Sequence, residues 1–328
     1  MNKEIKLDIK NKKILYQLDA DASQSANQIA KKVGLSKEGV NYRINRMLKQ
    51  KIIKGFYTVL NTPQLGFIHF NTLIRFRDIN ETLKKNFIDF CKKEEQIIWC
   101  ASCYGSWDFS VSFLGKTIQE YDSFLSKILQ RFGNKIHEKS MSVIIDSPTY
   151  HRDYLIDSQE GKEFKYKISK TSKIDETEQR ILSTISQNAR MNIIHIAEKI
   201  KTSKDIVHYR IKQLEKKEII QGYRALIDSE KIGYIYYKML FSLKNLTNEK
   251  ETQLKNFCKI NPNIIQFIRY LGNWEIQIEL EVESEKQLYE ILEQIRKQFN
   301  TIIKTYDILK LKEEKLDYFP FKLNSKIF

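Results

Sequence analysis

Apolar side chains in the first sixty residues recur three and four positions apart, which is the spacing of one face of an α-helix. The first group lies at positions 14–18, the second at 29–33 and the third at 40–47. Gly34 and Ser36 separate the last two groups, and these residue types commonly end one helix and begin the next. The pattern predicts three short helices with a tight turn before the third, as in a helix-turn-helix.

After the third helix, apolar and polar side chains alternate over 55–60, which is typical of a strand leaving the helices. From Ile68 to Ile145 the chain then reads strand, helix, strand, turn, strand, helix, strand. That order belongs to the split βαβ, or ferredoxin-like, sandwich. The sequence therefore predicts an α+β fold in which a helix-turn-helix, similar to a winged helix, is followed by a ferredoxin-like βαββαβ sandwich.

The whole pattern occurs twice, at a constant offset of 167 residues. Asp8 corresponds to Asp175, for example, and Gly105 to Gly272. A period this long indicates two tandem units rather than a solenoid. We expect helix-turn-helix domains at 1–60 and 174–228, sandwiches at 61–150 and 229–320, and a linker at 151–173 with a short strand at 164–168. In the second sandwich we expect strands and helices at about 234–243, 249–260, 264–271, 275–282, 285–299 and 302–311.

The third helix of each unit has a polar face opposite its apolar stripe. In a helix-turn-helix this helix lies in the DNA major groove, where Asn and Arg can pair with base edges and Lys and Tyr reach phosphates. A polar face is also what any solvated helix shows, and Arg43 and Arg210 could pair within their own domains. Asn41 and His208 are the base-reading candidates. The side chains expected to contact double-stranded DNA are Ser36, Lys37, Asn41, Tyr42, Arg43, Arg46, Ser203, Lys204, His208, Tyr209 and Arg210.

The distribution of charge agrees with this interpretation. The chain holds 56 Lys and Arg against 41 Asp and Glu, a formal net charge of +15. Positions 1–60 carry 13 basic and five acidic side chains and positions 168–228 carry 12 and eight, whereas 67–146 and 233–314 are almost neutral. Phosphate binding needs basic residues concentrated where the duplex docks. We therefore expect the first helical unit to contribute more to nonspecific DNA affinity.

The sequence gives little support for a membrane span, a metal site or a bound cofactor. No apolar run reaches the roughly 18 residues of a membrane span, and no secretory signal follows Met1, so we expect a cytoplasmic protein with reduced thiols. Cys100 and Cys103 form a CxxC, but no second pair occurs, and on a strand the two would face opposite sides. Cys91 and Cys258 suit a core or interface. With neither GxGxxG nor a Walker motif, we expect no nucleotide, metal or other cofactor.

The segments 29–36, 40–47 and 52–56, followed by Leu65-Gly66, resemble the helix-turn-helix and linking strand of the leucine-responsive regulator/AsnC (Lrp/AsnC) family. A second copy runs from Ala189 to Gly233. The resemblance covers nearly the whole chain and implies a sequence-specific transcriptional regulator. Members usually carry one unit and pair through their sheets. This chain is therefore expected to form an internal pseudo-dimer, with further homo-oligomers left open, and to bind two non-identical half-sites.

In the same family a Gly-x-x-Asp hairpin lies near the effector pocket and the subunit interface. Gly105-Ser106-Trp107-Asp108 matches it, and Gly272-Asn273-Trp274-Glu275 matches it except at Glu275, so the two sites need not be identical. The tryptophans could line a pocket or simply pack on the sheet. For a small-molecule effector such as an amino acid, the resemblance implies contacts at Gly105, Trp107, Asp108, Gly272, Trp274 and Glu275.

Two alternatives belong to other functional classes. The siroheme decarboxylases share this architecture but carry a histidine on the strand before the hairpin and lack the glycine turn, whereas 99–104 and 267–271 contain no histidine here and both glycines remain. Catalysis is therefore not expected. The other alternative is a ligand-binding or scaffolding protein that has lost DNA binding. The dependence of DNA affinity on salt separates that class from a regulator.

Overall fold

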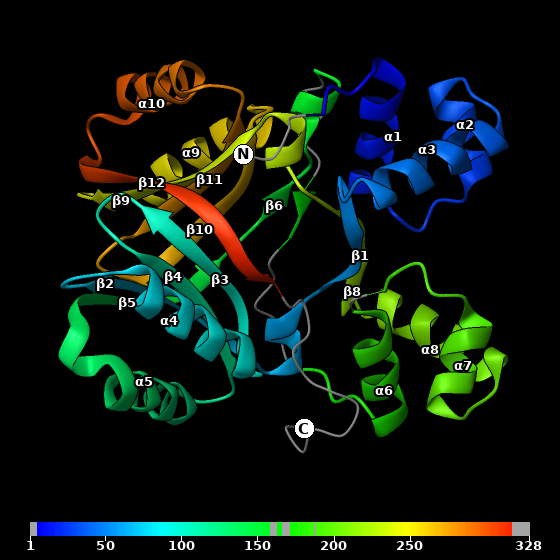
Figure 1. Cartoon of the computed structure of the whole chain (residues 1–328), viewed down its shortest axis with the longest axis horizontal. Helices are drawn as coiled ribbons and strands as arrows, with labels where there is room; N and C mark the ends of the chain where they lie inside the picture. The colour runs from blue at the N-terminus through cyan, green and yellow to red at the C-terminus, as the bar shows by residue number, and fades with distance from the viewer. Residues whose placement is uncertain (1–4, 158–162, 166–170, 187, 317–328) are drawn as a thin grey trace.

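The computed structural model describes residues 5–157, 163–165, 171–186 and 188–316. Two three-helix domains lie on one side of the molecule, and strands covered by four long helices lie on the other (Figure 1). We call α1 to α3 the first helical domain and α6 to α8 the second. Their helices are α1 Ile9–Ala20, α2 Ala26–Val33, α3 Lys37–Lys49, α6 Glu176–Ile185, α7 Ile193–Ile200 and α8 Lys204–Lys216.

The turn before the third helix forms in both helical domains, although only the first has a glycine there. Gly34 ends α2 with a left-handed backbone, φ +65°. Lys201 ends α7 with the same conformation, φ +57°, which costs a residue with a side chain about 1–2 kcal/mol. Ser36 and Ser203 then cap α3 and α8 through their hydroxyl groups. The serine caps and the apolar stripes are sufficient to set this turn without the second glycine.

The strands that leave the helical domains pair with each other, which the sequence pattern did not predict. β1 Ile53–Leu60 and β8 Ile220–Ile227 form an antiparallel two-stranded sheet, with Thr58 opposite Tyr223. Figure 1 shows this pair between the helical domains and the rest of the molecule. The pairing joins the two halves of the chain at their centre.

Each half continues into the predicted sandwich. The first contains β2 Ile68–Phe76, α4 Glu81–Lys93, β3 Ile97–Tyr104, β4 Phe109–Gly115, α5 Ile118–Phe132 and β5 Ile136–Asp146. The second contains β9 Ile235–Leu243, α9 Asn248–Ile260, β10 Ile264–Gly272, β11 Ile276–Val282, α10 Glu285–Phe299 and β12 Ile303–Leu316. Within the first half the strands lie in the order β3-β4-β2-β5, and the second half repeats it as β10-β11-β9-β12. This order is ferredoxin-like, so the predicted fold class is confirmed.

The two sheets join at both edges and close on themselves. β12 pairs with β3, where Leu311 lies opposite Cys103, and β10 pairs with β5, where Tyr270 lies opposite Ile144. We call the resulting ring of eight antiparallel strands the closed sheet. Helices α4 and α5 pack on the outer face of one half, and α9 and α10 on that of the other. The inner face of the ring is left to enclose other side chains.

Each helical domain packs mainly against the opposite half of the chain. The core of the first includes Ala225 of β8 and Tyr234 and Ile265 of the second sandwich region. The core of the second includes Leu65, Phe67 and Leu114 of the first half. Figure 1 shows the same crossing, with α1 to α3 beside α9 and α10, and α6 to α8 on the side of α4 and α5. The β1/β8 pair is where the two halves cross.

Three details differ from the expectations. The last strand was expected to end at 311 but continues to Leu316, because it pairs along β3. The segment expected as a linker begins with buried side chains in the short helix η3 Asp153–Leu155, after β6 Thr149–Tyr150. In place of the short strand expected at 164–168, β7 spans Glu163–Phe164, and 166–170 lie outside the described residues. Among the described residues, no helix is long and apolar enough to cross a bilayer.

Candidate functional site

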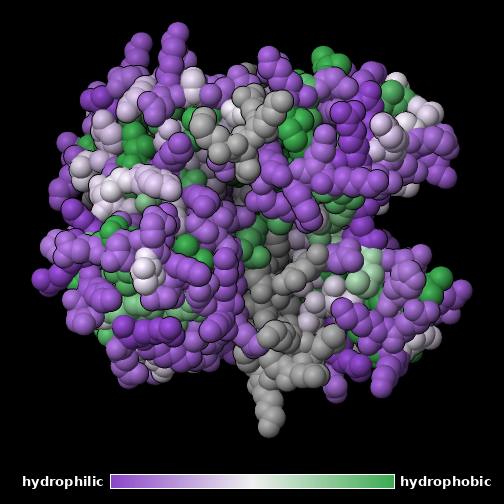
Figure 2. Space-filling view, viewed as in Figure 1, coloured by the Kyte–Doolittle hydropathy of each residue, from purple (hydrophilic) through white to green (hydrophobic). Residues whose placement is uncertain are grey.

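The polar face of the third helix is exposed in both helical domains. Lys37, Asn41 and Arg46 of α3 are exposed, as are Lys204 and His208 of α8. Tyr42 and Tyr209 occupy equivalent positions, and 67% and 59% of their surfaces are accessible. Large aromatic side chains this exposed, flanked by basic groups, are suited to contact a phosphate backbone. In Figure 2 the two helical domains form separate, mostly polar lobes with a notch between them.

The two arginines of these helices are held within their own domains. Arg43 Nη1 lies 2.6 Å from Asp8 Oδ2 and donates to Asn11 Oδ1 at 2.9 Å. Arg210 Nη1 lies 2.8 Å from Asp175 Oδ2 in the same geometry. Both pairs are partly exposed, so the guanidinium groups can still meet solvent at their outer edges. The structure thus realises the intradomain pairing that the sequence left open for Arg43 and Arg210.

Ser36 and Ser203 start the exposed helices rather than project from them. Their hydroxyls accept hydrogen bonds from the backbone of Gly39 at 3.0 Å and Ile206 at 3.2 Å. Such N-caps stabilise a helix by about 0.5–2 kcal/mol. Both serines also lie at the positive end of a helix dipole, where an anion such as a phosphate is favoured.

The glycine turns lie where the two halves meet. A Cβ at Gly105, whose φ is +147°, would lie 2.9 Å from the backbone oxygen of Ile308. A Cβ at Gly272 would lie 2.9 Å from the backbone oxygen of Met141 and would clash with Ser142. Both glycines are therefore required by the close approach of β12 and β5. Trp107 is buried and Trp274 packs on the same apolar cluster, so both tryptophans pack on the sheet.

Asp108 and Glu275 perform the same structural task despite their different lengths. The Asp108 carboxylate accepts a hydrogen bond from the backbone of Phe76 at 2.7 Å, and the Glu275 carboxylate accepts one from Leu243 at 2.8 Å. Phe76 and Leu243 are themselves equivalent positions of the repeat. The departure at Glu275 therefore leaves the turn intact.

A central cavity of about 510 Å³ lies between the β1/β8 pair and the inner face of the closed sheet. None of the six residues expected to contact an effector is among the side chains that line it. Its wall contains an unusual number of polar groups for the interior of a fold. The polar lining includes Asn61, His69, Arg152, Arg224, Tyr236, Lys238, Gln277, Glu279 and Glu281.

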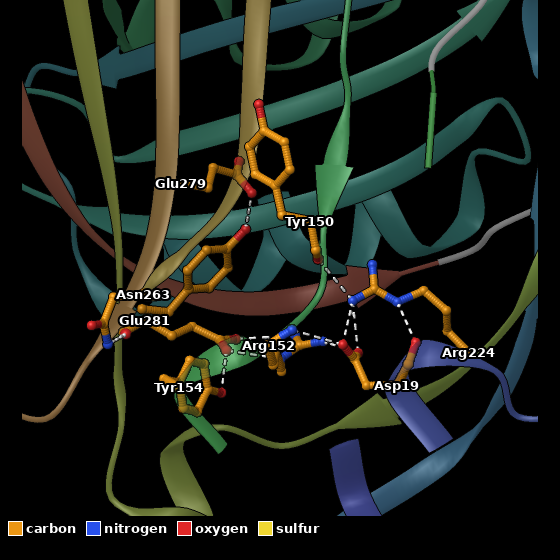
Figure 3. A network of polar contacts seen from close by, with 9 residues as sticks. Asp19, Tyr150, Arg152, Tyr154, Arg224, Asn263, Glu279 and Glu281 are labelled. Atoms are coloured by element: carbon orange, nitrogen blue, oxygen red, sulfur yellow. Dashed lines mark hydrogen bonds and ion pairs between the residues drawn. The ribbon is translucent and has the colours of Figure 1, made fainter. Parts of the chain in front are cut away.

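At one end of the cavity, a buried ionic network joins the first helical domain to the second sandwich (Figure 3). The carboxylate of Asp19, in α1, accepts from Arg224 Nη2 at 2.7 and 2.8 Å and from Arg152 Nη1 at 2.9 Å. Arg152 Nε in turn lies 2.8 Å from Glu281 Oε2, which also accepts from the Tyr154 hydroxyl at 2.5 Å. We call these five side chains the Asp19 network.

The charged groups of the Asp19 network stabilise one another in their ionised forms. Burial alone would raise the pKa of Asp19, but the charges of Arg224 and Arg152 outweigh it and keep that pKa below its usual value. The Arg224 guanidinium also donates to the Tyr150 carbonyl at 3.0 Å. Every charge in the network therefore has a partner, as buried ions require.

Among the described residues, the second helical domain shows no equivalent of this network. At the offset of 167, Asp19 corresponds to Ser186, Arg224 to Tyr57 and Glu281 to Leu114. There the contact uses neutral groups: Thr58 Oγ1 donates to the Ile185 carbonyl at 2.8 Å. The sequence pattern did not predict the network; its one signal is that Asp19, Arg224 and Glu281 are charged where the other copy has neutral residues.

The four cysteines are all buried. Cys100 packs against the outer aromatic core and Cys103 against the inner apolar cluster, so they face opposite sides of β3 as expected. Cys91 and Cys258 are fully buried. Among the described residues, no three His, Cys, Asp or Glu side chains come together as metal ligands would.

Comparison with known proteins gives two kinds of likeness. A family model described as winged helix-turn-helix DNA-binding matches residues 7–54 and again 174–221. The transcriptional regulator AzlB of Bacillus subtilis is 30% identical over 122 residues, which cover 37% of this chain and 78% of that protein. The regulatory protein AsnC of Haemophilus influenzae is 22% identical over 119 residues, 36% of this chain and 79% of that protein.

A solved structure matches almost the whole molecule. The siroheme decarboxylase NirDL superposes with a TM-score of 0.65 at 9% identity, over 97% of this chain and 96% of that one. At this identity the likeness concerns the fold: both molecules have the same succession of domains.

Proposed function

This chain belongs to the Lrp/AsnC family of transcriptional regulators, and from that premise we propose that it binds two non-identical DNA half-sites through α3 and α8. The single observation that carries the proposal is that one frame, the closed sheet with the β1/β8 pair, carries two helix-turn-helix domains whose exposed faces differ. Glu38, Gly39 and Asn41 stand in α3 where Asp205, Ile206 and His208 stand in α8. Different side chains on the two helices favour different bases.

The fusion has a physical consequence for affinity. In a dimer of separate subunits, a second DNA-binding helix is available only in the fraction of molecules in which the subunits are associated. Here the second helix is always attached, so its effective concentration near the adjacent half-site is set by the fold. We propose half-sites about one helical turn apart, or a multiple of it.

The proposed contacts are the exposed residues of both helices. Lys37, Tyr42, Lys204 and Tyr209 are assigned to phosphates, and Arg46 to phosphate or guanine. Asn41 and His208 are assigned to bases. Arg43 and Arg210, which are ion-paired at their inner edges, would contribute only through their exposed edges, and Ser36 and Ser203 through the helix N-termini that they cap.

Binding to random-sequence duplex DNA across a salt series tests the DNA-binding role. Each phosphate contact contributes about −0.9 to the slope of log affinity against log salt. We expect a steep slope for the full chain. A flat slope would support a scaffolding protein that has lost DNA binding and would overturn the proposal.

Regulation by a small molecule such as an amino acid is part of the proposal, with the glycine turns as family-based contacts: Gly105, Trp107, Asp108, Gly272, Trp274 and Glu275. Trp274→Ala tests this assignment, because Trp274 is the less buried of the two tryptophans. An effector that acts at the turns should lose affinity in this variant while random-DNA binding is kept.

We propose that the chain acts as a regulator and not as an enzyme, even though NirDL shares its fold. The strand before each glycine turn, β3 and β10, carries no histidine. Incubation of the full chain with siroheme, followed by mass spectrometry of the tetrapyrrole, should show no loss of carboxyl groups. Turnover would favour the enzymatic alternative.

A further inference from the structure

Two polar atoms in the wall of the central cavity are buried without a hydrogen-bond partner among the described residues. They are Asn61 Oδ1 and His69 Nε2. Asn61 is 2% exposed, and its amide nitrogen already donates to Gln64 Oε1 at 3.1 Å, which leaves the oxygen open. An unsatisfied buried polar atom costs about 1–3 kcal/mol. Native proteins usually meet that cost with a bound molecule or water that supplies the missing group.

A lysine in the wall of the same cavity has spare hydrogen-bonding capacity. Lys238 is 1% exposed, and its ammonium donates to Ser110 Oγ at 2.9 Å. The nearest carboxylate oxygen, on Glu279, is 3.7 Å away, beyond hydrogen-bond distance. Glu279 is itself engaged by the Tyr236 hydroxyl and, at 2.7 Å, by Gln277 Nε2. An ammonium can donate three hydrogen bonds, so Lys238 can still receive an anionic group.

The other buried cations of the cavity are ion-paired at hydrogen-bond distance. Arg224 binds Asp19, and Arg152 binds both Asp19 and Glu281 in the Asp19 network. Lys238 is therefore the cation best placed to hold an anion at the inner face of the closed sheet, while Asn61 offers an acceptor and the neutral His69 ring offers an acceptor or a donor.

We propose that the central cavity binds a small organic carboxylate bearing hydrogen-bond donor groups, with its carboxylate on Lys238 and its donors on Asn61 and His69. A cavity of about 510 Å³ falls within the usual range for small-molecule sites. This site is separate from the glycine turns, whose residues do not line the cavity.

Because the two halves of the chain differ at these positions, the proposed site occurs once and binds its ligand in one orientation. The positions equivalent to Lys238, His69 and Asn61 carry Asn71, Tyr236 and Asp228. The position equivalent to Lys238 thus carries no cation for a ligand bound in the reverse orientation. One ligand binds per chain, with its carboxylate on the Lys238 ammonium beside Ser110.

The position of the cavity also bears on regulation, and this step rests on the proposed function. Arg152 and Arg224 line the cavity and hold α1 through Asp19, whereas Ser186 and Tyr57 stand at the positions equivalent to Asp19 and Arg224. A ligand whose affinity depends on the position of Arg152 would be coupled to the first helical domain. The expected effect on DNA binding is therefore greater at the half-site that α3 reads.

The test uses defined probes on the full chain. The probes are the twenty L-amino acids and the unbranched dicarboxylates from malonate to adipate, screened by thermal shift and followed by calorimetric titration. We expect at least one to raise the melting temperature measurably. The double variant Lys238→Met/Glu279→Gln, which removes the cation without leaving its partner charged, should weaken binding of that probe at least tenfold.

Two further variants provide an independent test and a control. Asn61→Ala, elsewhere in the cavity wall, should weaken the same probe several-fold. It gives an independent result if circular dichroism shows that the double variant does not fold. Lys312→Met is the matched control, because Lys312 lies at the cavity, is exposed and pairs with Glu314 at 3.8 Å. It should bind the probe as the unmodified chain does.

Three results would overturn the proposal: no probe binds, binding survives both cavity variants unchanged, or binding is lost in Trp274→Ala while the cavity variants keep it. Failure here is distinct from failure of the proposed function. The salt-dependent DNA binding of the unliganded chain needs neither Lys238 nor Asn61 and is measured in the same variants.

Discussion

Asp19→Asn is the most direct perturbation of the Asp19 network, which holds the first helical domain against the second sandwich. Asp19 is 0% exposed, and its carboxylate accepts hydrogen bonds from the Arg152 backbone and from the guanidinium groups of Arg152 and Arg224. The substitution keeps the shape but removes the negative charge. Arg152 retains Glu281, whereas Arg224 is left with neutral carbonyl partners.

The expected cost follows from this geometry. Removing one partner of a buried ion pair typically destabilises a protein by about 3–5 kcal/mol. The equivalent position in the second helical domain provides a matched control, since Ser186 is also buried and donates one hydrogen bond, to the Ser183 carbonyl at 3.2 Å. Ser186→Ala should cost only about 1 kcal/mol.

Urea unfolding followed by tryptophan fluorescence, at pH 7, gives the free energy of unfolding of both variants. Because the pKa of Asp19 is held below 3.8 in the folded protein, its stabilisation is present above that pH and is lost as pH falls through the folded pKa. The difference between the unmodified chain and Asp19→Asn should therefore persist from pH 7 to pH 4 and shrink below. Equal losses in Asp19→Asn and Ser186→Ala would refute this account of the network.

Two other predictions concern charge and pH. Lys37→Gln should weaken binding to random DNA more than Lys204→Gln at the equivalent position, since positions 1–60 hold 13 basic against five acidic side chains and positions 168–228 hold 12 against eight; equal losses in a gel-shift titration would contradict it. Burial lowers the pKa of His69 from 6.5 to about 4. As the pH falls, the unfolded chain therefore takes up a proton before the folded chain does, and the free energy of unfolding should decrease between these two pH values. The loss should be on the order of 2 kcal/mol, discounted because His69 is only half-buried, and His69→Gln should largely abolish it; an unchanged pH profile in that variant would count against an uncharged His69 ring in the folded protein.

Local patterns were enough to predict most of the secondary structure. The helical stripes, the caps at Ser36 and Ser203 and the glycine turns depend on neighbouring residues, so sequence spacing shows them directly. The 167-residue repeat then extended the prediction from one half to the other. Even Lys201 adopts the left-handed turn, because its surroundings repeat those of Gly34.

Contacts between the two halves of the chain could not be predicted from such local patterns. The crossing at β1 and β8 and the extension of β12 to Leu316 depend on which distant strand lies alongside. The Asp19 network joins four segments that are far apart in the sequence, and the cavity exists only because the sheet closes. The glycine turns were found correctly as turns, whereas the structure shows their glycines and tryptophans engaged in packing between the halves.

The central claim is that one chain carries two different DNA readers in a fixed arrangement. Sites selected from random DNA with the full chain, and then compared by gel shift with palindromes built from each selected half, test it most directly. The account predicts tightest binding to a composite of two different half-sites, spaced about one helical turn apart or a multiple of it. Tighter binding to a perfect palindrome of either half would contradict it.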